Sequence, residues 1–252
     1  MSGQPDSASA LRSQSRTDPG WRHPNRRAFM ALAGGGALCL LGGGRAEAAT
    51  PIPFGPSIGQ AGWKDWTFRG IAETHYSAAG TGELRIEARQ SSSVIYRAIP
   101  VAARRSMRAS WQWRVDEGVA ATDLGRRGGD DRSLALYVVF VDAATADSYG
   151  EETPSLSRMM GLSGGRTLIY VWGGSAPAGT LIPSPYLRGR GTSIILRPAG
   201  AGGWANESVD LAADHRRAFG TTPERVAAVA VSSDSDDTGA VNIAAIRNLA
   251  FG

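Results

Sequence analysis

Two strand-like runs, joined by an acidic and glycine-rich connector, dominate residues 107–140. In the first run, Trp111, Trp113 and Val115 alternate with polar residues, so they point to one face of a strand. The second run, residues 134–141, is apolar throughout and rich in β-branched and aromatic side chains, which is typical of a central strand buried on both faces. These runs predict that the chain builds its core from strands and hides its tryptophans there.

Further strand-like runs follow one another at short spacing. We expect strands at residues 73–77, 84–88, 94–99, 167–172, 192–197, 226–233 and 241–251. One helix is expected at residues 211–219, with Asp210 as its N-cap and Gly220 at its end. The crossover helices that a parallel α/β sheet needs are missing. The sequence therefore predicts an all-β fold, an antiparallel two-sheet β-sandwich of jelly-roll type with one short helix near the C-terminus.

The first 48 residues resemble an export signal of the twin-arginine type. Arg26 and Arg27 precede an apolar run at residues 31–41, which is too short to span a bilayer as a stable helix. The small residues Ala46 and Ala48 suit a signal peptidase. We therefore expect a periplasmic or secreted protein that meets the twin-arginine export machinery and a signal peptidase, with no stable transmembrane segment in the mature chain. The alternative is an arginine-rich disordered tail beside a buried apolar helix.

The mature chain is expected to consist of an extended lead-in, residues 49–62, and a single domain, residues 63–252. Three prolines in the lead-in argue against a helix there. The whole chain has 27 Lys and Arg against 23 Asp and Glu, but six of the basic and three of the acidic residues lie before residue 49. The remainder is nearly neutral, which argues against nucleic acid as a partner. Cys39 is the only cysteine, so the mature domain contains no thiol chemistry and no disulfide.

Five stretches of the mature chain together resemble a family of exported bacterial proteins built on a domain of unknown function. They are WQWRVD at 111–116, the Asp pair at 130–131 with LYVVF at 136–140, YVW at 170–172, the helix at 214–220 and SDSDDTG at 233–239. The resemblance spans residues 63–251 and implies an envelope β-sandwich, with no catalytic residue to transfer. The chain departs from the family pattern at residues 246–248, where an aromatic residue and Gly-Asp are common, and at His215, where an aromatic residue is common.

The acidic motif at residues 234–239 resembles the first half of a calcium loop. Asp234, Asp236 and Thr238 offer oxygen ligands at alternate positions before a glycine. The position that should supply the closing bidentate carboxylate is occupied by Ala245. Calcium is therefore a candidate cofactor, and the alternative is an acidic turn whose side chains bond to their own backbone.

Asp130 and Asp131 come directly before the apolar strand at 134–141, where a site at the rim of a sandwich is expected. Their carboxylates can bind a cation or sugar hydroxyls. The alternative is a structural ion pair with Arg114 or Arg132.

Aromatic residues are the third group of candidates. Trp172 lies on the same strand face as Tyr170, while Tyr149 and Tyr186 fall in expected loops. Exposed aromatic rings can stack on the apolar faces of sugars. Packing in the core is the alternative, above all for Trp172.

Catalytic residues are not identified by any complete motif. Ser163 has the Gly-x-Ser-x-Gly spacing, but no strand leads into it and no helix leads out of it, as a nucleophile elbow requires. His75 and His215 are too few for a zinc site. Glu151 or Glu152 paired with Asp131 remains an alternative in the manner of a glycosidase, because their separation is not visible in the sequence.

The leading hypothesis is an exported sandwich that binds a carbohydrate or envelope polymer without catalysis. The first alternative is a carbohydrate-active hydrolase or lyase that uses the rim carboxylates Asp130 and Asp131. The second is a structural envelope protein whose partner is another protein.

Overall fold

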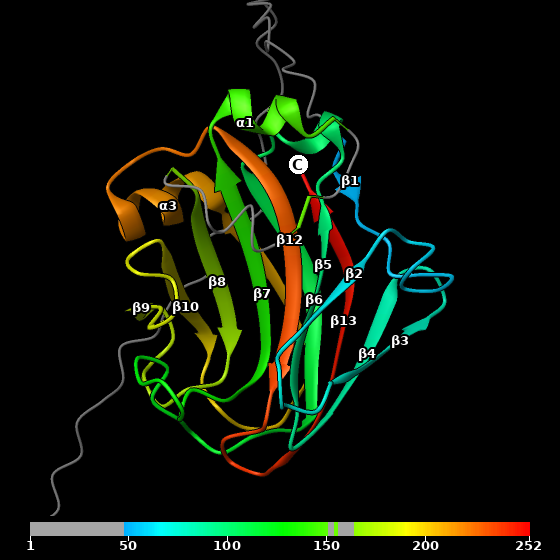
Figure 1. Ribbon diagram of the computed structural model, residues 1–252, viewed down its shortest axis with the longest axis vertical. Helices are drawn as coiled ribbons and strands as arrows, with labels where there is room; N and C mark the ends of the chain where they lie inside the picture. Colours follow the sequence, from blue (N-terminus) through cyan, green and yellow to red (C-terminus); the bar gives the residue numbers. More distant parts are fainter. Residues whose placement is uncertain (1–47, 151–153, 156–163) are drawn as a thin grey trace, which may run out of the picture. The chain divides into compact units, whose positions relative to one another are not determined.

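A computed structural model describes residues 48–150, 154–155 and 164–252, which form two β-sheets packed face to face (Figure 1). Sheet A has the strand order β11-β6-β13-β4-β3, and β1 pairs with β13. It consists of β1 (Thr50–Pro51), β3 (His75–Ala79), β4 (Glu83–Arg89), β6 (Arg108–Glu117), β11 (Gly202–Asp210) and β13 (Val241–Phe251). Sheet B has the order β2-β5-β12-β7-β8-β10-β9. It consists of β2 (Lys64–Thr67), β5 (Ser92–Ala98), β7 (Arg132–Val141), β8 (Arg166–Trp172), β9 (Leu181–Pro183), β10 (Gly191–Arg197) and β12 (Arg225–Asp234).

The two-sheet sandwich expected from the sequence is confirmed, with one local difference. Consecutive strands such as β12 and β13 lie in opposite sheets, as in a jelly roll. One pair in sheet B, β8 with β10, is parallel, with Gly191 opposite Thr167. The connection at residues 173–190 carries the chain back along the sheet before β10 begins, which is what a parallel pair requires.

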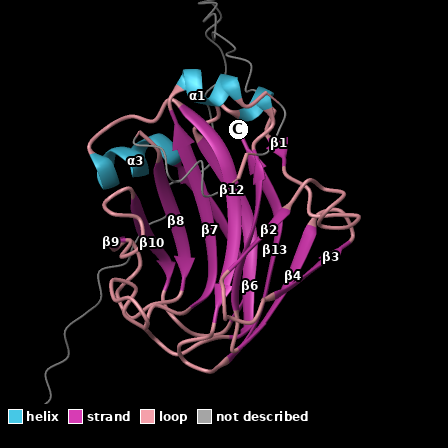
Figure 2. Cartoon of the chain, in the orientation of Figure 1, coloured by secondary structure: helices cyan, strands magenta, loops and turns pink. Residues whose placement is uncertain are grey.

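Helices are few among the described residues (Figure 2). The expected helix is confirmed as α3 (Leu211–Phe219): Asp210 accepts a bond from the Ala213 N–H at 2.9 Å, and Gly220 ends it in the left-handed conformation with φ of 73°. A short 3₁₀ helix (η1, Val101–Ala103) and α1 (Ala143–Ser148) were not expected. In α1 the Asp142 side chain caps the Thr145 N–H, but its six residues are too few to show a hydrophobic period.

The interior between the sheets contains the tryptophans of β6, as the alternating pattern predicts. Trp111, Trp113 and Val115 are at most 2% exposed. The ring of Trp113 meets those of Trp111 and Trp172 edge to face, at centroid distances of 5.4 and 5.8 Å. The lead-in contributes to the same core, because β1 pairs with β13 and the buried Phe54 stacks on Trp63 at 5.0 Å.

Sheet B is buried on both of its faces. On β7, Leu136, Val138 and Phe140 face the interior, whereas Tyr137 and Val139 belong to a second apolar cluster on the outer face. Side chains from the edge strand and the connecting loops pack against this outer cluster, among them Trp66, Phe68 and Leu187. The prediction that residues 134–141 are buried on both faces is confirmed, and the outer face gains a partly covered hollow. No helix in the described part of the chain is both long and apolar enough to cross a membrane.

Candidate functional site

A cavity of about 510 Å³ lies on the outer face of sheet B, under the loops that follow β2 and precede β7 and β10. One part of its wall is apolar and partly aromatic, formed by Trp66, Phe68, Val94, Leu124, Val139 and Ile169. The other part is polar and lies where β5, β7 and β12 meet. The volume is in the range of small-molecule sites, about 300–1,000 Å³.

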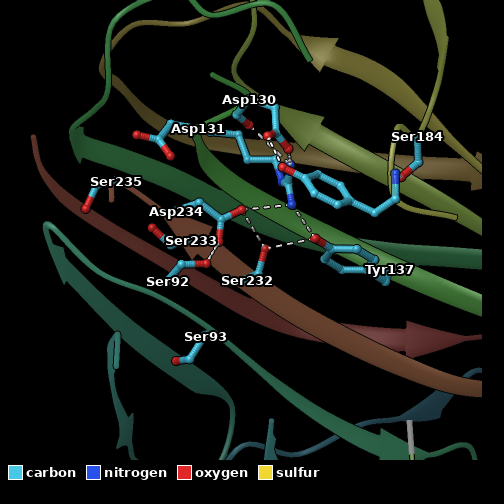
Figure 3. A network of polar contacts seen from close by, with 12 residues as sticks. Ser92, Ser93, Asp130, Asp131, Tyr137, Ser184, Ser232, Ser233, Asp234 and Ser235 are labelled. Carbon is cyan, nitrogen blue, oxygen red and sulfur yellow. Dashed lines mark hydrogen bonds and ion pairs between the residues drawn. The ribbon is translucent and has the colours of Figure 1, made fainter. Parts of the chain in front are cut away.

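Figure 3 shows the polar part from close by, with Asp130, Tyr137 and Asp234 labelled. Arg132 contacts all three of these residues. Its guanidinium pairs with Asp130 at 3.2 Å and with Asp234 at 2.8 Å, and it donates a hydrogen bond to the Tyr137 hydroxyl at 2.6 Å. Asp234 also accepts a hydrogen bond from Ser92 at 2.6 Å. A single cation thus joins two carboxylates and a phenol that come from β7, from β12 and from the loop before β7.

Strand register brings these side chains together. Asp234, the last residue of β12, lies opposite Arg132 at the start of β7 and opposite Ser92 at the start of β5. The register of β12 and β7 shifts between Ser232 and Asp234, at the same end of the sheet. A break in the ladder at the end of a sheet is a common way to aim side chains into a site.

Burial and the local charges set the ionisation of this network. Burial of Arg132 opposes its charged form, but Asp234, Tyr137 and Asp130 outweigh that effect and raise the pKa of its guanidinium. Burial also disfavours the charged forms of Tyr137 and Asp234 and so raises the pKa of both groups, while the positive charge of Arg132 opposes the rise. The tyrosine therefore stays a hydrogen-bond donor near neutral pH.

Asp131 has a structural task beside this network. Its carboxylate accepts bonds from the Thr238 N–H at 2.7 Å and from the Thr238 hydroxyl at 2.6 Å, and its backbone oxygen accepts one from Thr122. Asp131 is only 1% exposed. The two acidic motifs that the sequence singled out are thus in contact, because Asp131 holds the loop between β12 and β13.

The oxygen atoms of the acidic loop do not fit a calcium ion as they are arranged. The Asp234 carboxylate is bonded to the Arg132 guanidinium, and the Thr238 hydroxyl donates to Asp131. The described residues contain no group of three or more His, Cys, Asp or Glu side chains placed to hold a metal ion. The motif forms a turn between β12 and β13 whose Asp234 and Thr238 side chains bond to Arg132 and Asp131 rather than to the backbone of the motif itself.

Asp236 and Asp237 line the cavity from the same loop. Burial, helped by Asp131, Asp234 and Asp237, raises the pKa of Asp236 to about 6. Burial and the charges of Asp131 and Asp130 raise the pKa of Asp237, while a backbone bond from Asp130 opposes the rise. The cavity therefore holds carboxyl groups that are costly to ionise.

The shift at Asp236 predicts a pH-dependent stability. The folded chain keeps the proton of Asp236 up to about pH 6, whereas the unfolded chain releases it near pH 3.8. The stability that the raised pKa of Asp236 contributes is therefore fully present below pH 3.8 and is lost as the pH rises through about 6. An amide at this position does not titrate, so the Asp236→Asn variant should gain stability relative to the parent chain as the pH is raised from about 5 to about 7.

Urea unfolding of both chains at the two pH values measures this gain. Asp147→Asn, on the exposed surface of α1, is the control, and the gain for Asp236→Asn should exceed any change that this control shows between the two pH values. A difference for Asp236→Asn that does not change with pH would contradict the shift.

Tyr186 stands at the open side of the cavity. Its side chain is 49% exposed, its hydroxyl donates to Asp130 at 2.7 Å, and Arg127 lies over its ring at 5.0 Å. Burial and the bond to Asp130 raise the pKa of this phenol to about 12. The sequence indicated Tyr186 and Asp130 as separate candidates, and the structure brings them into contact.

Trp172 and Tyr149 lie elsewhere, which corrects the expectation that they contact a ligand. Trp172 is 5% exposed in the core between the sheets, and its indole N–H donates to the Gly200 carbonyl at 2.9 Å. Tyr149 is 6% exposed at the end of α1. Both rings are used for packing, and neither is among the residues that line the cavity.

The remaining sequence candidates do not form a catalytic group. His215 is buried between Phe140 and Phe219, and His75 is exposed on sheet A. Of the two arginines considered as partners of Asp130, Arg132 forms the ion pair, whereas Arg114 pairs with Asp116. Glu151, Glu152 and Ser163 lie outside the described residues, as do residues 1–47 of the expected signal at 1–48.

The aromatic part of the cavity wall, Trp66 and Phe68, was not among the site residues predicted from the sequence. Trp66 and Phe68 flank one another at a centroid distance of 5.6 Å and line the cavity. The signal that could have found them is the Trp-x-Phe spacing on a short edge strand, which puts both rings on one face. The strand β2 was not expected, because its four residues carry one apolar side chain.

Comparisons with known proteins identify a family and two distant folds. The model of a family described as "Protein of unknown function (DUF3047)" matches residues 61–250. No curated protein sequence matches the chain. The xyloglucanase domain of NopAA, a type three effector from Sinorhizobium fredii in complex with cellobiose, superposes with a TM-score of 0.43 and 9% identity, over 75% of this chain and 90% of that one.

The enzymatically active domain of tailspike protein 4 from bacteriophage CBA120 superposes with a TM-score of 0.33 and 10% identity, over 75% of this chain and 19% of that one. At these scores and identities, neither structure indicates an activity for this chain.

Proposed function

We propose that this chain, which belongs to the DUF3047 family of proteins of unknown function, is a noncatalytic glycan-binding domain. It would hold a sugar unit of a polysaccharide or envelope polymer in the cavity on sheet B. The observation that carries the proposal is the composition of that cavity: aromatic rings form one part of its wall, and a charged hydrogen-bonding network forms another.

Sugars need both kinds of surface. One face of a pyranose ring carries mainly C–H groups and stacks on aromatic side chains, here Trp66 and Phe68. Its hydroxyls lie around the rim of the ring and need directed donors and acceptors, which Tyr186, Arg132 and Asp130 offer beside the aromatic wall. Because these polar groups are already bonded to one another, they are held in place before a ligand arrives.

Export is part of the proposal. The signal-like segment at residues 1–48 supports transport through the twin-arginine route to the periplasm or the exterior, where envelope glycans are found. A sandwich that folds before transport suits that route. The proposed mature domain is residues 63–252 preceded by the lead-in at 49–62.

A carbohydrate-active hydrolase or lyase is the second candidate, favoured by one observation. Asp236 lines the cavity, and its pKa is raised to about 6, which suits a general acid. Asp131 is unsuited to the role because its carboxylate is buried and bonded to Thr238. Reducing ends released from a bound polysaccharide, and lost on Asp236→Asn substitution, would favour the enzyme over the binding module.

Replacement of Trp66 by alanine tests the binding proposal. Loss of the ring removes stacking area from the cavity wall and should weaken binding of oligosaccharides, identified on a glycan array, by about tenfold or more. Isothermal titration calorimetry measures the change.

Trp204→Ala is the matched control. Trp204 is also a partly exposed tryptophan, but it lies on β11 of sheet A, beside Arg247 and away from the cavity. Its replacement should leave the affinity unchanged. Equal losses from both substitutions, or no binding of any glycan by the parent chain, would refute the proposal.

A further inference from the structure

The charge of the cavity is unbalanced. Five aspartates line it, but Arg132 is the one lysine or arginine among its lining residues. Arg132 is committed to Asp130 and Asp234, and Asp131 is committed to the loop that contains Thr238. Arg127, outside the cavity lining, donates to the Pro185 carbonyl and lies over Tyr186. Two carboxylates, Asp236 and Asp237, are therefore left without a balancing cation.

Neither of these two carboxylates forms an ion pair within the described ranges 48–150, 154–155 and 164–252. Besides burial, the charges that raise the pKa of these groups belong to other carboxylates, namely Asp131, Asp234 and Asp237 for Asp236, and Asp131 and Asp130 for Asp237. A positive group bound beside them would replace this repulsion by attraction. An anionic ligand would increase it.

We infer that the cavity selects glycans with free amino groups, whose ammonium ions would lie beside Asp236 and Asp237, over neutral and acidic glycans. This inference rests on the proposed function and names its ligand class. An ammonium group also gains from the faces of nearby aromatic rings, and Trp66 and Tyr137 line the same cavity. The ligand is a sugar rather than a bare ion, because about 510 Å³ with a partly aromatic wall far exceeds what one ion fills.

Three tetrasaccharides that differ in one substituent test the selection. Cellotetraose carries a hydroxyl at carbon 2, the N-acetylglucosamine tetramer a neutral amide, and the glucosamine tetramer an amine. Titration calorimetry near pH 7 and at low salt should show the glucosamine tetramer binding about five- to tenfold more tightly than cellotetraose. The preference should shrink as salt is added, because exposed charges are screened.

The double variant Asp236→Asn/Asp237→Asn should reduce that ratio to about one. Asp116→Asn/Asp147→Asn changes the net charge equally at two positions outside the cavity lining, and should keep the ratio of the parent chain. A preference that survives in the first variant, or that falls equally in both, overturns the inference. If the parent chain binds cellotetraose as tightly as the glucosamine tetramer, the preference for amino groups is overturned, but the proposed glycan binding is not. If none of the three sugars binds, both the preference and the proposed glycan binding are overturned.

Discussion

Replacement of Arg132 by methionine is expected to lower the free energy of unfolding by about 3–5 kcal/mol. The substitution leaves Asp130 and Asp234 buried, at 6% and 7% exposure, without the cation that pairs with both. It also removes one of the two hydrogen-bond partners of the Tyr137 hydroxyl, the other being the Ser232 hydroxyl. A buried charge without a counter-charge is among the most destabilising changes that one substitution can produce.

Urea unfolding followed by tryptophan fluorescence measures this loss, with Arg85→Met as the control. Arg85 pairs with Glu83 on the surface of sheet A, and its side chain is 66% exposed, so its loss should cost less than about 1 kcal/mol. The double variant Arg132→Met/Asp234→Asn removes one of the stranded charges and should recover part of the lost stability. Equal stabilities for Arg132→Met and Arg85→Met would contradict the prediction, because the network around Arg132 would then stabilise the fold no more than a surface ion pair does.

Replacement of Trp113 by alanine is expected to lower the free energy of unfolding by about 3–5 kcal/mol, or to prevent folding at about 37 °C. Trp113 is fully buried between the sheets, where its ring meets Trp111 and Trp172. Its indole N–H donates to Glu207 at 2.8 Å. The substitution therefore creates a large cavity, and it also removes one hydrogen bond from the partly buried carboxylate of Glu207.

The size of the effect is read from denaturant midpoints, and the Trp204→Ala variant is again the comparison. Trp204 is partly exposed on the outer face of sheet A, so its loss should change stability by less than about 1 kcal/mol. If Trp113→Ala were no more destabilising than Trp204→Ala, the result would contradict the burial of Trp113 between the two sheets.

Local pattern determined much of the fold. The helix at 211–219 and the strand at 241–251 have the bounds that the sequence predicts, because capping residues and period-two alternation act within a few neighbours. The short elements β2, β9, η1 and α1 were missed, and so was the nine-residue strand β11. β2 and β9 are positioned by pairing with β5 and β10 at the edges of sheet B, and α1 by local capping. Strands of four or fewer residues carry almost no period.

The candidate site was predicted in part. The acidic residues of two motifs were identified separately, Asp130 and Asp131 before β7, and Asp234 and Asp236 at the end of β12. Their contact depends on the register that places Asp234 opposite Arg132, which is set by pairing between strands about a hundred residues apart. For Trp172 the sequence left ligand contact and core packing open, because alternation shows which residues share a face, and not whether that face is the inside or the outside of the sandwich. The structure places Trp172 in the core.

The sequence by itself determined that this chain builds paired β-layers around buried tryptophans, because side-chain alternation and burial are properties of each strand. Only the tertiary structure decided that the outer face of sheet B carries a cavity, and which acids in it are balanced by Arg132 and which are not. The reason is physical: a binding site is made by side chains that distant strands and loops bring within a few ångströms of one another, and no spacing along the chain encodes that distance.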